Sequence, residues 1–96
     1  MTAYVITRIE VTDPVRYEDY KALTPAAVAA HNGRFVVRGG EMEVLEGEPE
    51  QRRIVVVQFA DMDTARAFYD SEEYRAARAA RAGAANMQMI LVDGAD

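Results

Sequence analysis

Arg38 is the side chain that the sequence places best for chemistry, because two glycines follow it directly. Adjacent glycines let the backbone adopt positive φ, so the chain can turn or bulge sharply and hold a neighbouring side chain at a fixed place. A guanidinium held there can bind a carboxylate, an enolate or a phenolate through two hydrogen bonds. The alternative is an ion pair with Glu41 or Glu46 that only stabilises the turn. The sequence leaves both interpretations open.

Two further residues are candidates for moving a proton. His31 is the only histidine, and imidazole changes its charge close to neutral pH. The same residue also suits the end of a helix, where the dipole favours a cation. Glu46 would act as an acid or a base if burial raised its pKa. A glutamate there more often stays in water or pairs with a cation such as Arg53, to which we assign a structural role.

Four tyrosines are candidates for binding a ligand, and they fall within the stretches where helices are expected. Tyrosines at helical spacing are usually core or interface residues whose hydroxyl reaches the surface. Their number nevertheless favours a pocket between helices and sheet that takes a small, polar organic molecule. They are Tyr17, Tyr20, Tyr69 and Tyr74.

The composition limits the kinds of partner and cofactor. The 96 residues carry a formal net charge of −5 and no cysteine, so we expect no nucleic-acid partner and no thiolate site. Since there is one histidine and no phosphate-binding or dinucleotide motif, we also expect no metal and no bound cofactor. No apolar run approaches the length of a membrane span, and no signal sequence is visible. We therefore expect a cytoplasmic protein without a membrane partner.

Strands that would position these side chains are predicted from runs of β-branched and alternating apolar residues. The runs lie at residues 4–11, 34–38, 53–59 and 87–92, and a further strand is predicted at 41–46, after the double glycine.

Two helical regions are predicted between these strands, from apolar spacing and from residues typical of helix ends. Pro25 should kink or restart the first helix, because its ring clashes with the carbonyl four residues earlier. The expected N-caps are Asp13, Asp61 or Asp63, and Ser71, and the expected stops are Gly33 and Gly83.

The resulting order is β-α-β-β-α-β, the ferredoxin-like α+β arrangement, with a four-stranded antiparallel sheet and an extra hairpin segment in one domain, residues 1–96. Two helices can cover only one face of such a sheet. Residues 53–59 and 87–92 nevertheless carry aliphatic side chains on both faces. Since an uncovered apolar patch usually marks an interface, we expect a homodimer in which two sheets face each other.

An ordered set of short features spans nearly the whole chain. It consists of Ala3-Tyr4-Val5-Ile6, Asp13-Pro14, Tyr17, Tyr20, Gly33-Arg34-Phe35, Arg38-Gly39-Gly40, Leu45-Glu46-Gly47, Arg53, Phe59, Ala65, Tyr69-Asp70-Ser71, Tyr74 and Arg81. Taken together, these features resemble the domain-of-unknown-function family 1330, within the dimeric α/β-barrel superfamily. One difference is His31-Asn32, where the family often has an aromatic residue and a glycine.

The resemblance implies a homodimer, a dimeric α/β barrel, but no agreed activity. Relatives in the wider superfamily include cofactor-free monooxygenases, isomerases and dehydratases as well as ligand-sensing modules. One expectation is therefore a cofactor-free enzyme that acts on a small carbonyl or phenolic compound. Arg38 would stabilise negative charge in it, and His31 or Glu46 would move the proton. The other is a non-catalytic ligand-binding or stress-associated module, and the sequence does not decide between them.

Overall fold

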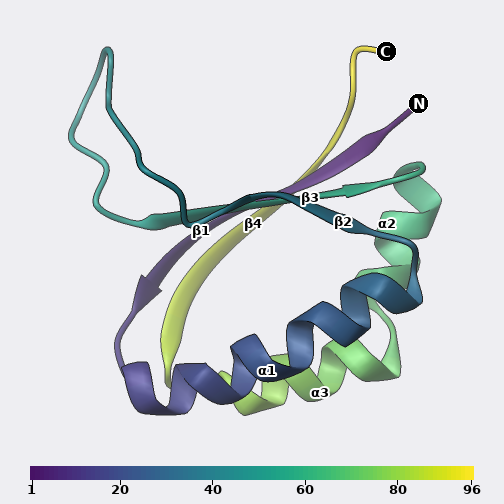
Figure 1. Ribbon diagram of the computed structural model, residues 1–96, viewed down its shortest axis with the longest axis horizontal. Helices are drawn as coiled ribbons and strands as arrows, with labels where there is room; N and C mark the ends of the chain where they lie inside the picture. The colour runs from purple at the N-terminus through teal and green to yellow at the C-terminus, as the bar shows by residue number, and fades with distance from the viewer.

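The computed structural model describes all residues, 1–96, and contains one antiparallel sheet of four strands and three helices (Figure 1). The strands lie in the order β2-β3-β1-β4, which confirms the predicted ferredoxin-like α+β fold. The elements in chain order are β1 (Ala3–Val11), α1 (Pro14–Ala30), β2 (Arg34–Arg38), β3 (Arg53–Phe59), α2 (Met62–Tyr69), α3 (Glu72–Ala80) and β4 (Ala85–Asp93).

All three helices lie on one face of the sheet, as Figure 1 shows. On that face, alternate residues of β1 from Ala3 to Ile9 are buried. They meet three aromatic side chains, Phe59, Phe68 and Tyr74, which are the largest that the fold buries completely. The ring of Phe68 lies 4.9 Å from that of Phe59 and 4.5 Å from that of Tyr74. The core is thus built around a row of rings between β3 and the two shorter helices.

The predicted N-caps are confirmed at all three helices. Side-chain oxygens of Asp13 and Asp61 accept hydrogen bonds from main-chain N–H groups of the first turn, at 3.2 and 2.7 Å. The Ser71 hydroxyl accepts in the same way from the N–H of Tyr74, at 3.2 Å. Each cap satisfies a donor that the helix itself leaves free.

Helix α1 runs on past Pro25 to Ala30, so the new start, one of the two alternatives predicted at this proline, does not occur. Proline removes one main-chain hydrogen bond from the helix. The turn after it is held by the core, since Ala27 and Val28 are buried there. Tertiary packing of this kind contributes more to a helix than local propensity does, so the helix tolerates the proline.

The prediction of a strand at residues 41–46 is wrong. The last contact of this region with the sheet is made by Gly39, whose N–H donates to the carbonyl of Ile54 at 2.9 Å. Residues 40–52 then form a loop outside the sheet. A strand requires a hydrogen-bonded neighbour. Because β3 begins only at Arg53 and lies between β2 and β1, no strand is available opposite residues 41–46.

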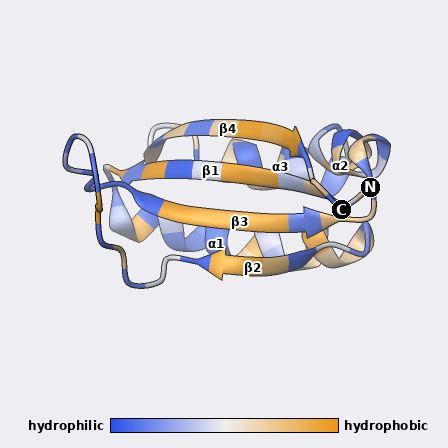
Figure 2. Cartoon of the chain, turned by 90° about the horizontal axis from the view of Figure 1, so that it is seen from above, coloured by the Kyte–Doolittle hydropathy of each residue, from blue (hydrophilic) through white to orange (hydrophobic).

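The face of the sheet away from the helices carries an apolar band that crosses all four strands. Cross-strand pairing places Val37 opposite Val56, Val56 opposite Ile6, and Ile6 opposite Ile90. Figure 2 shows the strands from above, with apolar residues in orange. We call this surface the open face.

No helix of the protein is long and apolar enough to cross a membrane.

Candidate functional site

A small cavity of about 40 Å³ lies between the covered face of the sheet and helix α1. Since one water needs roughly 10–15 Å³ of such space, the cavity holds about three waters or a small polar group. Anything larger requires side chains at its edge to move outward. Most of the surface that lines the cavity is apolar. The lining residues that carry a polar group are Thr7, Tyr17, Tyr20, Lys21, Thr24, Arg38, Arg53 and Tyr74.

Arg53 is the most enclosed charge in this lining. Its Nε is buried and has no hydrogen-bond partner, and Arg53 forms no ion pair. The guanidinium packs against the backbone of Gly39, so closely that a Cβ at that position would lie 2.5 Å from its Cζ. Gly39 also has a φ of +67°, in the left-handed region that favours glycine. Gly39, the first of the two adjacent glycines, therefore makes room for Arg53.

Arg38 reaches the same cavity because β2 contains a bulge. The register pairs Phe35 with Val57 but Arg38 with Val55, with an irregularity between Phe35 and Val37. Val55 and Val57 are on the covered face, so the bulge turns Arg38 to the face that a regular strand would have given to Val37. The Arg38 side chain is exposed, and its guanidinium lies 4.4 Å from the centre of the Phe35 ring. It forms no ion pair with Glu41 or Glu46.

Two buried tyrosines join at the inner part of the cavity lining. The hydroxyl groups of Tyr20 and Tyr74 share a hydrogen bond of 2.7 Å, and the Tyr74 hydroxyl donates to the sulfur of Met89 at 3.3 Å. Burial and the neighbouring Tyr74 hold the pKa of the Tyr20 phenol well above its usual range. Tyr20 is therefore a neutral hydrogen-bonding group rather than a base at neutral pH.

Tyr17 lies closer to the cations. Burial raises the pKa of its phenol and Tyr20 adds to this effect, while Arg53, Arg81 and Arg38 oppose it. Arg81 lies 5.5 Å from the centre of the Tyr20 ring, and its buried Nε also lacks a partner. The region around Tyr17 is thus apolar and positively charged, and it suits an anionic oxygen.

Tyr69 belongs to a second, more open hollow of about 260 Å³ at the outer side of α2 and β4. Its ring stacks on the guanidinium of Arg78, at 4.2 Å. Two residues, Val5 and Met89, line both this hollow and the cavity. The structure therefore brings Tyr17, Tyr20 and Tyr74 together in the cavity lining, whereas Tyr69 contacts this group only through the Tyr74 ring, at 5.7 Å, and does not line the cavity.

The two proposed proton carriers lie away from the cavity. His31 caps the C-terminus of α1, before β2 begins, whereas Arg38 ends β2. The Nδ1 of His31 is 3.2 Å from the carbonyl oxygen of Ala27, and its ring lies against Phe68. Glu46 is exposed in the loop and makes no hydrogen bond or ion pair. Neither residue lines the cavity.

Arg53 was not among the predicted site residues, although the residue pattern of its strand contains the signal. Successive side chains of a strand point to opposite faces, so Arg53 shares a face with Val57 and Phe59, which are buried in the core. A charged residue on the buried face of a strand, next to the double glycine, is a candidate for binding. The bulge that places Arg38 has no comparable signal in the sequence.

The chain matches the DUF1330 family, a domain of unknown function, over residues 2–95. The protein belongs to the DUF1330 family. No curated protein matches it significantly.

Solved structures share the fold of this DUF1330 protein over almost its entire length. RPA0582, a protein of unknown function from Rhodopseudomonas palustris, has a TM-score of 0.77 at 13% identity, with 99% of this chain and 83% of that one covered. SnoaB, described as a cofactor-independent oxygenase from Streptomyces nogalater, has a TM-score of 0.71 at 16% identity, with 99% and 94% covered. A dimeric ferredoxin-like protein of unknown function from Jannaschia sp. CCS1 has a TM-score of 0.74 at 13% identity, with 98% and 100% covered. At such identities the likeness shows the fold alone.

Proposed function

We propose that this DUF1330 protein is a homodimeric small-molecule enzyme that acts, without metal or bound cofactor, on a small carbonyl or phenolic compound. The observation that carries the proposal is Arg53, a cation without an ion pair and with a buried, unpartnered Nε, in the lining of a cavity that Tyr17, Tyr20 and Tyr74 also line. Buried polar groups normally have partners, so an orphaned guanidinium donor calls for one. An anionic oxygen of a ligand supplies it.

The charges of the site favour the ionised form of such a compound. Arg53 and Arg38 stabilise a phenolate or an enolate relative to the neutral form, because they act in surroundings that are largely apolar. No carboxylate and no imidazole lines the cavity. A reaction in which the substrate releases its own acidic proton therefore fits better than an isomerisation or dehydration that needs a protein base.

Oxygenation of a phenolate is such a reaction. A phenol with a free ring carbon loses its hydroxyl hydrogen and the hydrogen of that carbon, and dioxygen is the oxidant. The O–O bond breaks, one oxygen atom bonds to the ring carbon, and the other leaves as water with the two hydrogens, so the products are a quinone and water. In this scheme Arg53 and Arg38 lower the pKa of the bound phenol, and the tyrosines orient its ring. The description of SnoaB as a cofactor-independent oxygenase supports the scheme, since the two chains share a fold.

The proposed homodimer forms through the open face, as in a dimeric α/β barrel. Completing the burial of an aliphatic side chain such as Ile90, which is 42% exposed, or Val92, which is 41% exposed, stabilises an assembly by roughly 0.6–1.3 kcal/mol each. The Jannaschia protein of the same fold is described as dimeric, which supports this assembly.

A non-catalytic ligand-binding module is the second candidate. The absence of a carboxylate or imidazole from the lining favours it, because binding an anion needs the cations alone. In that case the protein binds phenolates without consuming dioxygen. Oxygen uptake with a panel of phenols separates the two functions.

Binding is tested with para-nitrophenol, whose yellow phenolate reports its own ionisation. We expect the protein to increase the absorbance of the phenolate at constant pH, and Arg53→Met to abolish the increase. Arg75→Met is the matched control, because Arg75 is exposed on α3 and is not part of the cavity lining. Equal responses of the two variants would remove Arg53 from the site. No response of the unmodified protein to any small phenol or carboxylate would refute the proposed function.

A further inference from the structure

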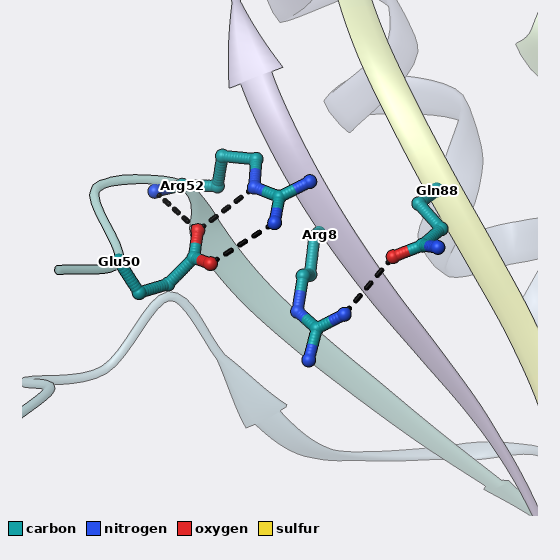
Figure 3. Close-up of polar contacts among 4 residues, drawn as sticks. All are labelled: Arg8, Glu50, Arg52 and Gln88. Carbon is teal, nitrogen blue, oxygen red and sulfur yellow. Dashed lines mark hydrogen bonds and ion pairs between the residues drawn. The ribbon is translucent and has the colours of Figure 1, made fainter. Parts of the chain in front are cut away.

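The loop between β2 and β3 contains a ten-residue segment that makes very few hydrogen bonds with its own chain. This segment, residues 41–50, is called the acidic arm. All of its residues except Glu50 are exposed. Its only hydrogen bonds and ion pair join Glu50 to Arg52, with the Arg52 guanidinium at 2.8 and 3.0 Å from the carboxylate (Figure 3). In Figure 1 the loop extends beyond the sheet on the side away from the helices.

The composition of the acidic arm is unusual for a solvated loop. It contains five glutamates and no basic residue. It also contains three large apolar side chains in water, with Met42 and Val44 43% exposed and Leu45 86% exposed. Exposed apolar groups gathered in one segment are typical of an interaction surface. The carboxylates restrict that surface to a partner with positive charge.

The open face of the sheet has the complementary properties. Beside its apolar band it carries two arginines, Arg8 and Arg34, and neither pairs with a carboxylate. Arg8 donates to the amide oxygen of Gln88 at 3.0 Å (Figure 3), and Arg34 to that of Gln58 at 3.3 Å. Both guanidiniums therefore keep donors free for a carboxylate.

We infer that the acidic arm of each protomer docks on the open face of a second copy of this chain. In a two-fold dimer every contact occurs twice. The arm of the first protomer meets the face of the second, and the arm of the second meets the face of the first, so one complementary pair of surfaces supplies both contacts. The apolar side chains of the arm extend the band, and its glutamates meet Arg8 or Arg34 of the other copy. This inference rests on the proposed homodimer and adds the arm to its interface.

Charge reversal tests the arm against the face. The arm variant is Glu43→Lys with Glu46→Lys, and the face variant is Arg8→Glu with Arg34→Glu. We expect each variant alone to dissociate at least about tenfold more readily than the unmodified dimer, because like charges then meet across the interface. An equimolar mixture of the two variants should recover a tight heterodimer, because each arm then meets a face of opposite charge. Sedimentation velocity over a range of concentrations measures the dissociation of the arm variant, the face variant and their mixture, each compared with the unmodified protein.

A matched control changes the same number of charges elsewhere. Glu18→Lys with Asp19→Lys alters two exposed residues of α1 and should leave the dimer as tight as the unmodified one. Circular dichroism confirms that every variant is folded. A monomeric unmodified protein would refute the homodimer itself. If the unmodified protein is a dimer and the arm variant dimerises as tightly as it does, the arm contact alone is refuted. A mixture of arm and face variants that stays dissociated would refute it as well.

Discussion

Replacing Gly39 with alanine tests the corner where β2 leaves the sheet. The left-handed backbone at Gly39, with a φ of +67°, costs an L-residue about 1–2 kcal/mol, of which the smaller entropy of the unfolded chain returns about 0.4–1 kcal/mol. The new methyl group would also lie 2.5 Å from Cζ and 3.0 Å from Nε of Arg53. Overpacking of this kind costs about 1–3 kcal/mol. We expect Gly39→Ala to lower the free energy of unfolding by about 2–3 kcal/mol.

Two other glycines separate the contributions. Gly47 has a φ of +100°, but no atom lies within 4 Å of the place that a Cβ would occupy, so Gly47→Ala measures the backbone cost alone, about 1 kcal/mol. Gly40 has neither a positive φ nor a neighbour within 4 Å. Gly40→Ala should therefore be neutral or slightly stabilising, because it only reduces the freedom of the unfolded chain.

Urea unfolding at one fixed protein concentration measures the series, since a dimer's stability depends on concentration. With a slope of about 1–2 kcal/mol per molar urea, the midpoint of Gly39→Ala should fall by about 1–3 M. The same variant should bind para-nitrophenol more weakly, because the methyl group displaces Arg53. If Gly39→Ala and Gly47→Ala unfold at the same urea concentration and Gly39→Ala binds normally, the packing of Arg53 on Gly39 is refuted.

Three further changes test local contacts. Because the pKa of Tyr20 is raised, the folded protein keeps that proton longer than the unfolded chain, so stability should be constant up to about pH 10. Above it Tyr20 should contribute a fall of at most ~1.4 kcal/mol per pH unit, and Tyr17, whose pKa is also raised, should add to that fall. Tyr74→Phe, which removes the hydrogen bond to Tyr20, should reduce that fall, as alkaline unfolding measured by circular dichroism would show. The carboxyl carbon of Glu50 should titrate in NMR with a pKa of about 2, because Arg52 hydrogen-bonds to its carboxylate. Arg52→Ala should return this pKa to the normal range of a glutamate. A pKa that does not change in the variant would exclude the pair in solution. Ser71→Ala removes the cap of α3 and should cost about 1 kcal/mol in urea unfolding.

The order of elements was predictable because the signals for it are local. Asp13, Asp61 and Ser71 each bond to a main-chain N–H three residues on, so a short sequence contains the whole cap. The strands of the sheet alternate or run apolar within their own length. Such signals need no knowledge of the rest of the chain, and the fold follows from their order.

The errors concern features that depend on distant residues. Residues 41–44 alternate charged and apolar side chains as a strand does, but a strand also needs a neighbour, and β3 starts too late to supply one. Pro25 weakens α1 locally, yet burial of Ala27 and Val28 keeps the helix intact. Both outcomes are decided by tertiary contacts that the local pattern does not contain.

The candidate site was predictable only in part for a related reason. Tyr17, Tyr20 and Tyr74 lie on the inner sides of two helices, and their spacing indicated this. Arg38 reaches the cavity through a bulge, which depends on the pairing of β2 with β3 rather than on the residues of β2 alone. Arg53 could have been predicted from strand alternation. The role of Gly39, which leaves space for the Arg53 guanidinium, is visible only in the packed structure.

The corner at Gly39 connects the cavity to the proposed interface. On one side, Gly39 packs on Arg53, the cation of the cavity, and on the other it leads directly into the acidic arm. If the arm docks on a second copy, docking also fixes the backbone that holds Arg53. Coupling between two binding events is reciprocal, so a phenolate bound at Arg53 should tighten the dimer by the same factor by which dimerisation tightens its binding. Sedimentation with and without para-nitrophenol measures the first factor, and phenolate titrations of the dimer and of the dissociated arm variant measure the second. If para-nitrophenol leaves dimer dissociation unchanged and dimer and arm variant bind it equally well, the corner does not transmit the effect.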